Sequence, residues 1–310
     1  MMKSLKFQGP VLIVIAAILW ALDGVVRRSL FTLPPITIVF LEHLIGTALL
    51  LPLIAKEFLA QKFTSRIIGL AIAVSLLSSL LGTLWFTTAL AKVNFISFSV
   101  VFLLQKLQPI FVILSATLLL KEKITPKYLQ WAALAFVAAY FVTFKNGYVS
   151  FATGNQTVIA AGYALAAAAA WGIGTTLSKL LMREVSSNVA TGLRFIGATI
   201  FGLLGVMVMG QSGSLSMVEP SQWARLVFIA LSTGMVALWI YYRGLQKTEA
   251  KIATLLELVF PLLAVFIDAV IYKSFLAPSQ YLAAVVLMFA LYQIALLQKP
   301  EKVASQANES

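Results

Sequence analysis

The 310-residue chain contains no cysteine and a single histidine, His43. The missing cysteines exclude a disulfide framework and a thiolate metal site. One histidine cannot form a histidine metal cluster, so we expect neither a metal nor a cofactor. Charged residues are also scarce, at 11%, where soluble domains carry about 25%. The chain therefore lacks the polar surface of a soluble globular protein.

Hydrophobic residues, in contrast, make up 61% of the chain, against roughly 45–50% in soluble domains. This composition is typical of a protein embedded in a lipid bilayer. The net charge of +12 would also suit nucleic acid. The basic residues, however, fall in short clusters between apolar runs, which is the pattern of membrane-protein loops. We therefore expect no nucleic-acid partner.

Apolar runs of about 20 residues, long enough to cross a bilayer, predict an all-α integral membrane protein with ten transmembrane helices. The expected spans are 11–30, 36–55, 67–90, 97–120, 126–144, 157–178, 189–209, 223–243, 251–272 and 279–297. With the N-terminus in the cytoplasm, 15 of the 23 Lys and Arg residues lie on the cytoplasmic side and 6 on the outer side. Because cytoplasmic loops carry the excess of positive charge, we expect a multi-pass protein of the cytoplasmic membrane with both termini cytoplasmic.

The chain is internally duplicated. Trp20 precedes Trp171 by 151 residues, and Pro109 precedes Pro261 by 152. Further pairs at similar offsets are Gly46 with Gly197, Lys92 with Lys247 and Pro126 with Pro278. The repeats are expected at 1–150 and 151–310, the latter with a polar C-terminal tail, within one integrated transmembrane domain. Since five spans is an odd number, the second repeat must enter the membrane in the opposite sense, which is the inverted-repeat architecture of secondary transporters.

Several segments resemble a known family. The first span reads AILWALDG where its partner reads AAAWGIG, and LEHLIGT matches LRFIGA. The segment QPIFVILSATLLLKEKITPKYLQ and its partner FPLLAVFIDAVIYKSFLAPSQYL keep both prolines, although Ser274 replaces the glutamate found at Glu122. Over roughly residues 9 to 297, the chain resembles the EamA-type members of the drug/metabolite transporter superfamily. The resemblance implies helices around a central cavity, with the fifth and tenth spans outside it, and transport of small organic solutes, often by export.

Charged side chains at bilayer depth cost about 2.5 kcal/mol or more each, so they usually face the bundle interior and mark a pathway. Inverted symmetry and estimated depth predict two clusters, Glu42 and His43 with Lys106, and Arg194 with Glu257. The expected cavity residues are Trp20, Asp23, Glu42, His43, Gln105, Lys106, Trp171, Arg194, Tyr241 and Glu257. Gln105 and Glu257 each stand four residues before a repeat proline, where a carbonyl is left exposed.

For four of the ionisable residues, the sequence allows two alternative roles. Asp23 and Arg27, four apart, form either an ion pair at the outer end of the helix or a gate. Arg194 either faces the cavity or extends to the cytoplasmic interface. His43 either senses protons or is a hydrogen-bonded core residue.

Two further features are read in the same way. Trp20 and Trp171 are either walls of the site or simple packing residues. Asp268, near Lys273 and the end of its span, is expected at the membrane interface rather than in the site.

These features predict a transporter and not an enzyme. A cavity with acidic and basic groups would suit an amino acid or similar zwitterion, moved by alternating access with export favoured. The alternative is proton-coupled uptake, with a proton as the coupling ion. A membrane enzyme acting on a lipid-linked substrate is the remote alternative, because converging acid, base and nucleophile are missing. The oligomeric state, monomer or dimer, stays open.

Overall fold

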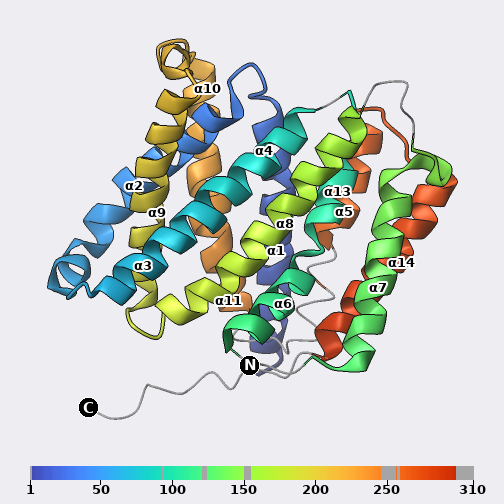
Figure 1. Ribbon diagram of the computed structural model, residues 1–310, viewed down its shortest axis with the longest axis horizontal. Coiled ribbons are helices and arrows are strands. Elements are labelled where there is room, and N and C mark those ends of the chain that lie inside the picture. Colours follow the sequence, from blue (N-terminus) through green and yellow to red (C-terminus); the bar gives the residue numbers. More distant parts are fainter. Residues whose placement is uncertain are drawn as a thin grey trace.

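The computed structural model describes residues 2–92, 94–120, 124–149, 155–245, 256 and 259–297, and the elements along these residues are helices (Figure 1). The first half contains α1 (Met2–Arg28), α2 (Pro35–Ala60), α3 (Ser65–Val74), η1 (Ser75–Gly82), α4 (Thr83–Ala91), α5 (Phe98–Gln105), α6 (Gln108–Leu120), α7 (Pro126–Thr143) and η2 (Lys145–Gly147). The second half contains α8 (Gln156–Leu181), α9 (Ser187–Val208), η3 (Ser212–Leu215), α10 (Pro220–Phe228), η4 (Ile229–Val236), α11 (Ala237–Leu245), α13 (Val259–Val270) and α14 (Pro278–Leu297).

Within the described residues, seven helices are long and apolar enough to cross a membrane. They are Gly9–Arg28, Pro35–Ala60, Ser65–Ala91, Phe98–Leu119, Gln156–Leu181, Ser187–Val208 and Pro278–Leu297. Each overlaps an expected span to within several residues. The expected fifth span is α7, the eighth is α10, η4 and α11 together, and the ninth is described only in part, as α13. The protein is thus an all-α membrane-spanning bundle.

Sequence signals explain where the helices begin. Proline stands at the first helical position of α2, α7 and α10, where its missing N–H leaves no hydrogen bond unmade. The hydroxyl oxygens of Thr64, Thr125 and Ser186 accept the backbone N–H three residues on, which caps α3, α7 and α9. These caps fix the short turns that join neighbouring spans.

The third and eighth spans share an irregularity. Each contains a π-helical segment, η1 beginning at Ser75 and η4 beginning at Ile229. The two start 154 residues apart, which extends the duplication seen in the sequence to the backbone. Because π segments are rare and often lie at functional sites, their recurrence marks the helices that border the site.

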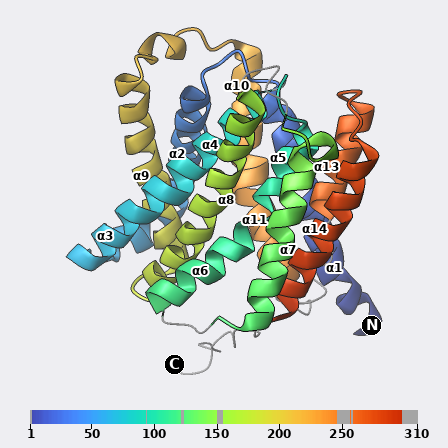
Figure 2. The ribbon, with the colours of Figure 1, turned by 45° about the vertical axis from the view of Figure 1, so that its right-hand side comes forward.

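Helix packing also repeats between the halves: a helix of one half packs against helices of the other half in two corresponding arrangements. α1 packs against η4 and α11, and α8 packs correspondingly against η1 and α4. α2 packs against α9, and α7 against α14. Figure 2 shows α7 and α14 side by side at one edge of the bundle, where Trp131 meets Phe289 edge-to-face at 5.6 Å. Neither α7 nor α14 contributes to the cavity described below, as the family resemblance implied.

α1 and α8 run in opposite directions. The chain leaves α1 at the upper end of Figure 1, and α8 begins at that same end. The Lys92 Nζ at the end of α4 donates to the Gln156 Oε1 at the start of α8 at 3.0 Å. The Arg225 guanidinium in the last turn of α10 donates to the Ser29 carbonyl just after α1 at 3.2 Å. These contacts tie the two halves together at this end.

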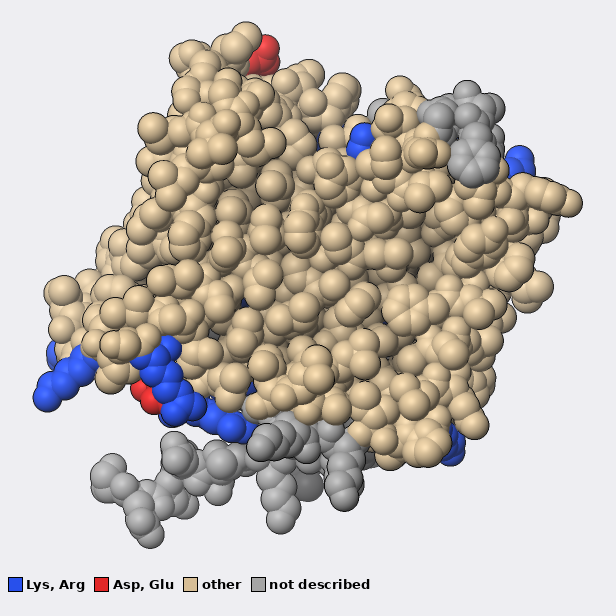
Figure 3. All heavy atoms as spheres, in the orientation of Figure 1, with Lys and Arg blue, Asp and Glu red and all other residues tan. Residues whose placement is uncertain are grey.

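On the outer face shown in Figure 3, charged side chains lie at the ends of the bundle. Figure 3 shows a face that is almost entirely free of Lys, Arg, Asp and Glu over its middle, with basic side chains gathered at the lower end. Lys56 near the end of α2, Arg66 at the start of α3 and Lys179 near the end of α8 belong to that end. Such an apolar belt with charged ends matches the requirements of a bilayer.

Candidate functional site

A cavity of about 380 Å³ lies at the centre of the bundle. Its walls come from both halves of the chain, with contributions from α1, α2, α4, α5, α6, α8, η4, α11 and α13. The lining residues are Trp20, Asp23, Arg27, Glu42, Thr83, Phe86, Gln105, Lys106, Gln108, Trp171, Gly234, Tyr241 and Phe260. This volume lies at the lower end of the usual range for small-molecule sites, about 300–1,000 Å³.

Seven of the residues expected at the cavity line it. They are Trp20, Asp23, Glu42, Gln105, Lys106, Trp171 and Tyr241. His43 and Arg194 lie outside this lining, and Glu257 falls outside the described residues.

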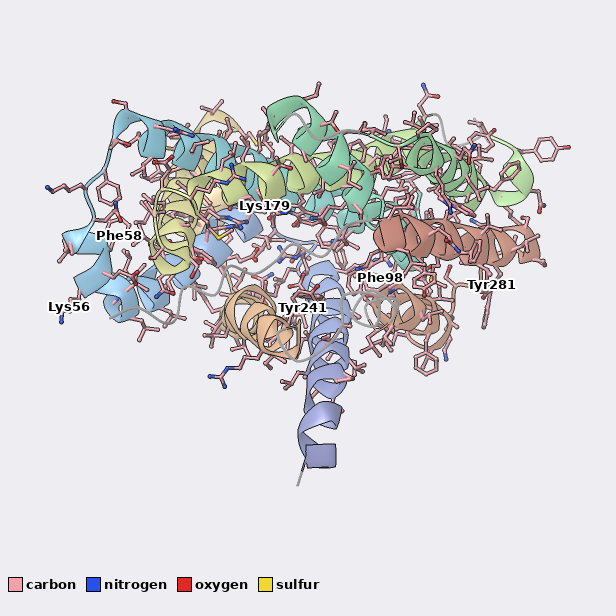
Figure 4. All side chains as sticks on the ribbon, turned by 90° about the horizontal axis from the view of Figure 1, so that it is seen from below. Lys56, Phe58, Phe98, Lys179, Tyr241 and Tyr281 are labelled. Atoms are coloured by element: carbon pink, nitrogen blue, oxygen red, sulfur yellow. The ribbon has the colours of Figure 1, made fainter. Side chains whose placement is uncertain are left out.

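Aromatic rings form two walls of the cavity. Trp20 on α1 contacts Tyr241 on α11 with ring centroids 5.3 Å apart, and Figure 4 shows Tyr241 close to α1, seen from below. Trp171 on α8 contacts Phe86 on α4, also at 5.3 Å. Such walls bind flat apolar surfaces by stacking and dispersion.

A glycine fixes the position of one of these rings. A Cβ atom placed on Gly82, at the end of η1, would come within 2.7 Å of the Trp171 indole. Only a residue without a side chain lets the ring lie against this backbone. The orientation of Trp171 in the cavity therefore depends on Gly82.

A buried ion network lies at one side of the cavity. The Arg27 guanidinium is 3% exposed. Its Nε and Nη2 donate to the two Asp23 oxygens at 3.1 and 3.2 Å, and its Nη1 donates to Glu42 Oε2 at 2.8 Å. Nη1 also donates to the Thr87 hydroxyl at 3.2 Å. One cation thus satisfies two carboxylates and joins α1, α2 and α4.

This network adds to two expectations. Asp23 and Arg27 pair near the end of α1, as expected, and the pair is buried and borders the cavity. Glu42 was grouped with Lys106, whereas its ion-pair partner is Arg27. Depth estimates placed Glu42 correctly near the cavity. They could not show which cation lies across from it, because that depends on helix rotation.

The fourth span breaks beside the cavity. α5 ends at Gln105 and α6 begins at Gln108, with Lys106 and Leu107 in a turn between them. Pro109 has no N–H to bond the Gln105 carbonyl, and its ring excludes a regular helix there. Gln105, Lys106 and Gln108, which flank or form the break, all line the cavity. Lys106 Nζ lies 5.1 Å from the centre of the Phe260 ring, within cation–π range.

His43 on α2 and Arg194 on α9, 151 residues apart in the sequence, lie outside the lining of the cavity. Arg194 on α9 donates from Nε to Ser79 and from Nη2 to Ser78, both at 3.2 Å and both in η1. The Arg194 guanidinium is therefore held against η1. The His43 Nδ1 lies 2.8 Å from the Val39 carbonyl, which gives it a hydrogen-bonded core position.

Asp268 lies near the end of α13 and outside the lining of the central cavity, and its side chain is buried within the protein. It is 1% exposed, and its Oδ2 accepts hydrogen bonds from the Ser99 N–H at 2.7 Å and the Ser99 hydroxyl at 2.5 Å. Its Oδ1 accepts the Phe98 N–H at 3.2 Å. A carboxylate on α13 therefore caps the first turn of α5, across the boundary between the two halves. The cap satisfies backbone donors that would otherwise be buried.

A second, polar pocket of about 430 Å³ lies next to this cap. Arg28 and Tyr272 line it, with the Arg28 Cζ 4.3 Å from the centre of the Tyr272 ring. Phe98 and Phe102, both fully buried, pack near the cap with ring centroids 4.5 Å apart.

Sequence reasoning missed several lining residues. Gln108 and Phe260 stand at the repeat offset of 152 residues, each directly before a repeat proline. That placement could have identified both. Thr83, Phe86 and Gly234 carried no comparable signal, because they lie in uniformly apolar helices. Within the described residues, no group of three or more His, Asp or Glu side chains could hold a metal ion.

Comparison with known proteins identifies the family. A sequence model of the EamA-like transporter family matches residues 7–144 and 158–296. The riboflavin transporter ImpX of Fusobacterium nucleatum is 34% identical over 293 residues, covering 94% of this chain and 98% of that protein. A solved crystal structure shares the fold with a TM-score of 0.60 at 18% identity, over 95% of this chain and 97% of the other. The chain therefore belongs to the EamA-like transporter family, within the drug/metabolite transporters, and is a multi-pass membrane transporter of small molecules.

Proposed function

We propose that this protein carries riboflavin, or a closely related planar heteroaromatic metabolite, across the cytoplasmic membrane by alternating access. The observation that carries the proposal is the aromatic-walled cavity, in which Trp20 with Tyr241 and Trp171 with Phe86 provide flat apolar surfaces. The relative named as a riboflavin transporter covers nearly the whole chain. Amide groups from Gln105 and Gln108 supply hydrogen bonds at the cavity edge.

The charges of the cavity favour a neutral solute. Of the described lining residues, Asp23 and Glu42 are acidic, whereas Arg27 and Lys106 are basic. The formal charges balance, and both carboxylates already accept hydrogen bonds from Arg27. A solute with a net charge would disturb this balance in a low-dielectric interior, at considerable cost. Riboflavin is uncharged at neutral pH.

An amino acid or similar zwitterion is the second candidate, favoured by the presence of both signs of charge in the cavity. To bind there, its ammonium and carboxylate would have to compete with the bonds between Arg27 and its two partners. A small zwitterion would also make little use of the aromatic walls. The flavin proposal uses more of the lining, and for this reason we place it first.

The mechanism rests on the proposed architecture of ten spans in two inverted five-helix repeats, residues 1–150 and 151–310, around one central site. The equivalent π segments, the exchanged helix contacts and the opposed directions of α1 and α8 support it. Inverted repeats open to either side by exchanging conformations. Both termini are proposed to be cytoplasmic, from the distribution of Lys and Arg.

Direction and coupling form part of the same proposal. Export is the direction that the family resemblance implied, and proton-coupled uptake is its alternative. Among the described lining residues, we find no nucleophile with an adjacent base, as a membrane enzyme would need. Facilitated transport of a neutral solute, as a monomer or dimer, needs no coupling ion.

Counterflow in proteoliposomes tests the proposal. Vesicles preloaded with unlabelled riboflavin should transiently accumulate external labelled riboflavin, because a carrier exchanges one molecule for another. An excess of leucine or glutamate outside should not reduce the overshoot. Absence of any overshoot for riboflavin, together with saturable exchange of an amino acid, would replace the flavin proposal with the zwitterion one. Imposing a pH gradient in either direction separates facilitated from proton-coupled transport.

A further inference from the structure

Gln105 carries an unusual polar group at the edge of the cavity. It is the last residue of α5, directly before the break in the fourth span, and it lines the cavity. Among the described residues its side-chain oxygen Oε1 is buried and has no hydrogen-bond partner. Buried side-chain oxygens in native proteins almost always have a partner. An exception inside a binding cavity points to a partner that arrives with the ligand.

Several other acceptors near this position already have partners. Asp23 and Glu42 accept hydrogen bonds from Arg27. Thr175, beside the cavity, accepts the Gln108 amide at 3.4 Å and donates to the Trp171 carbonyl. Lys106 next to Gln105 can only donate. Of the described residues that line the cavity, Gln105 is the one whose buried side-chain oxygen has no hydrogen-bond partner, so it is available to accept a hydrogen bond from a solute.

The amide can reach the cavity with a small movement. Rotation about the terminal bond of a glutamine side chain is nearly free, because that torsion is broad and roughly two-fold. Turning the amide exchanges its oxygen and nitrogen and presents an acceptor beside a donor. The backbone of Gln105 is fixed at the end of α5, before the break at Pro109. The side chain can therefore rotate while the backbone stays in place.

We propose that Gln105 reads a ring N–H flanked by a carbonyl, the imide or lactam edge of a planar heteroaromatic solute. This inference rests on the proposed function and deepens it. A primary amide and such an edge match donor to acceptor in two parallel hydrogen bonds, in the way that Asn and Gln read one edge of adenine. The flavin ring carries this edge at N3 with its adjacent carbonyls. The rest of the ring then extends toward the aromatic walls.

Paired ligands test the proposal. Binding of riboflavin and of N3-methylriboflavin to the purified full-length protein is measured by fluorescence titration. The methyl group removes the donor and leaves the ring system in place. The wild type should bind riboflavin about 10- to 100-fold more tightly, since leaving a buried acceptor unpaired carries a penalty of this order.

Two variants test whether Gln105 causes the preference for riboflavin over N3-methylriboflavin. Gln105→Met keeps the length of the side chain without its hydrogen bonds, and should bind the two flavins within about 3-fold of each other. Gln108→Met, a glutamine on the same cavity, should keep the wild-type ratio of the two affinities whatever happens to each. If Gln105→Met does not fold, Gln105→Leu, which also removes the acceptor in a side chain of similar size, replaces it and should show the same reduced ratio.

The outcomes separate the two claims. Equal binding of both flavins to the wild type, or an unchanged preference in Gln105→Met, would overturn the role of Gln105 while riboflavin binding still supports the proposed function. Binding of neither flavin would overturn the proposed function and, with it, the inference.

Discussion

Replacing Arg27 with methionine should destabilise the protein severely. Arg27 makes three hydrogen bonds to two buried carboxylates and one to a buried hydroxyl. Removing it leaves Asp23 and Glu42 charged and unpaired in the interior. Breaking a buried ion pair in this way costs about 3–5 kcal/mol. We therefore expect the free energy of unfolding to fall by about that amount in Arg27→Met.

Removing the two carboxylate charges together with Arg27 tests whether the unpaired charges cause the loss of stability. In the triple variant Arg27→Met, Asp23→Asn and Glu42→Gln, no buried charge is left unpaired. Because such replacements are often close to neutral, the triple variant should recover much of the loss. The three positions touch, so their effects should not add.

A matched control uses an exposed ion pair. Arg66 is paired with Glu184 at 3.3 Å, but its side chain is 67% exposed. Pairs of this kind contribute about 0–1 kcal/mol, so Arg66→Met should change stability little. The assay is reversible unfolding by SDS in mixed micelles, followed by circular dichroism. An Arg27→Met variant as stable as Arg66→Met, or a triple variant less stable than Arg27→Met, would refute the buried-network account.

Three further predictions follow from close contacts in the bundle. Gly24→Ala should destabilise by about 1–3 kcal/mol, because a Cβ there would lie 2.3 Å from Phe102, whereas Gly69→Ala meets nothing within 4 Å and should leave the unfolding midpoint unchanged or higher. Asp268→Ala should lower stability by about 1–3 kcal/mol through loss of the α5 cap, and Asp268→Asn, which keeps one acceptor, should lower it less; equal losses in unfolding scans would contradict the capping role. Trp20→Ala should weaken riboflavin binding by roughly 5- to 100-fold, as loss of ring stacking on an aromatic does elsewhere, and an unchanged titration curve would remove Trp20 from the site.

Much of the bundle could be predicted because bilayer physics leaves few alternatives. Apolar length, the excess of basic residues at one end and repeated prolines at Pro109 and Pro261 depend on one-dimensional patterns. The family assignment, made on the same patterns, is confirmed by the match to the EamA-like transporter family. Helix ends differed by a few residues, since capping by Thr64 or Ser186 lies beyond the apolar run.

Side-chain partners could not be predicted in the same way. The choice of Arg27 over Lys106 as the partner of Glu42 depends on how far each helix is rotated, which hydropathy does not encode. Asp268 is expected near the membrane interface because Lys273 is close in sequence, but that pattern does not identify the donors that satisfy its carboxylate, which lie on α5 in the other half of the chain. The partners of the polar side chains thus depend on contacts between the two repeats, whereas the positions of the transmembrane spans follow from the sequence of each repeat alone.

The most direct test of the central claim is a fluorescence titration of riboflavin with the purified protein. Stacking of the flavin on the wall formed by Trp20 and Tyr241 should quench its emission, saturably and with one flavin per chain, and an excess of leucine should not reverse it. Quenching that does not saturate, that persists in the double variant Trp20→Ala and Tyr241→Ala, or that leucine competes away would contradict a heteroaromatic-binding cavity.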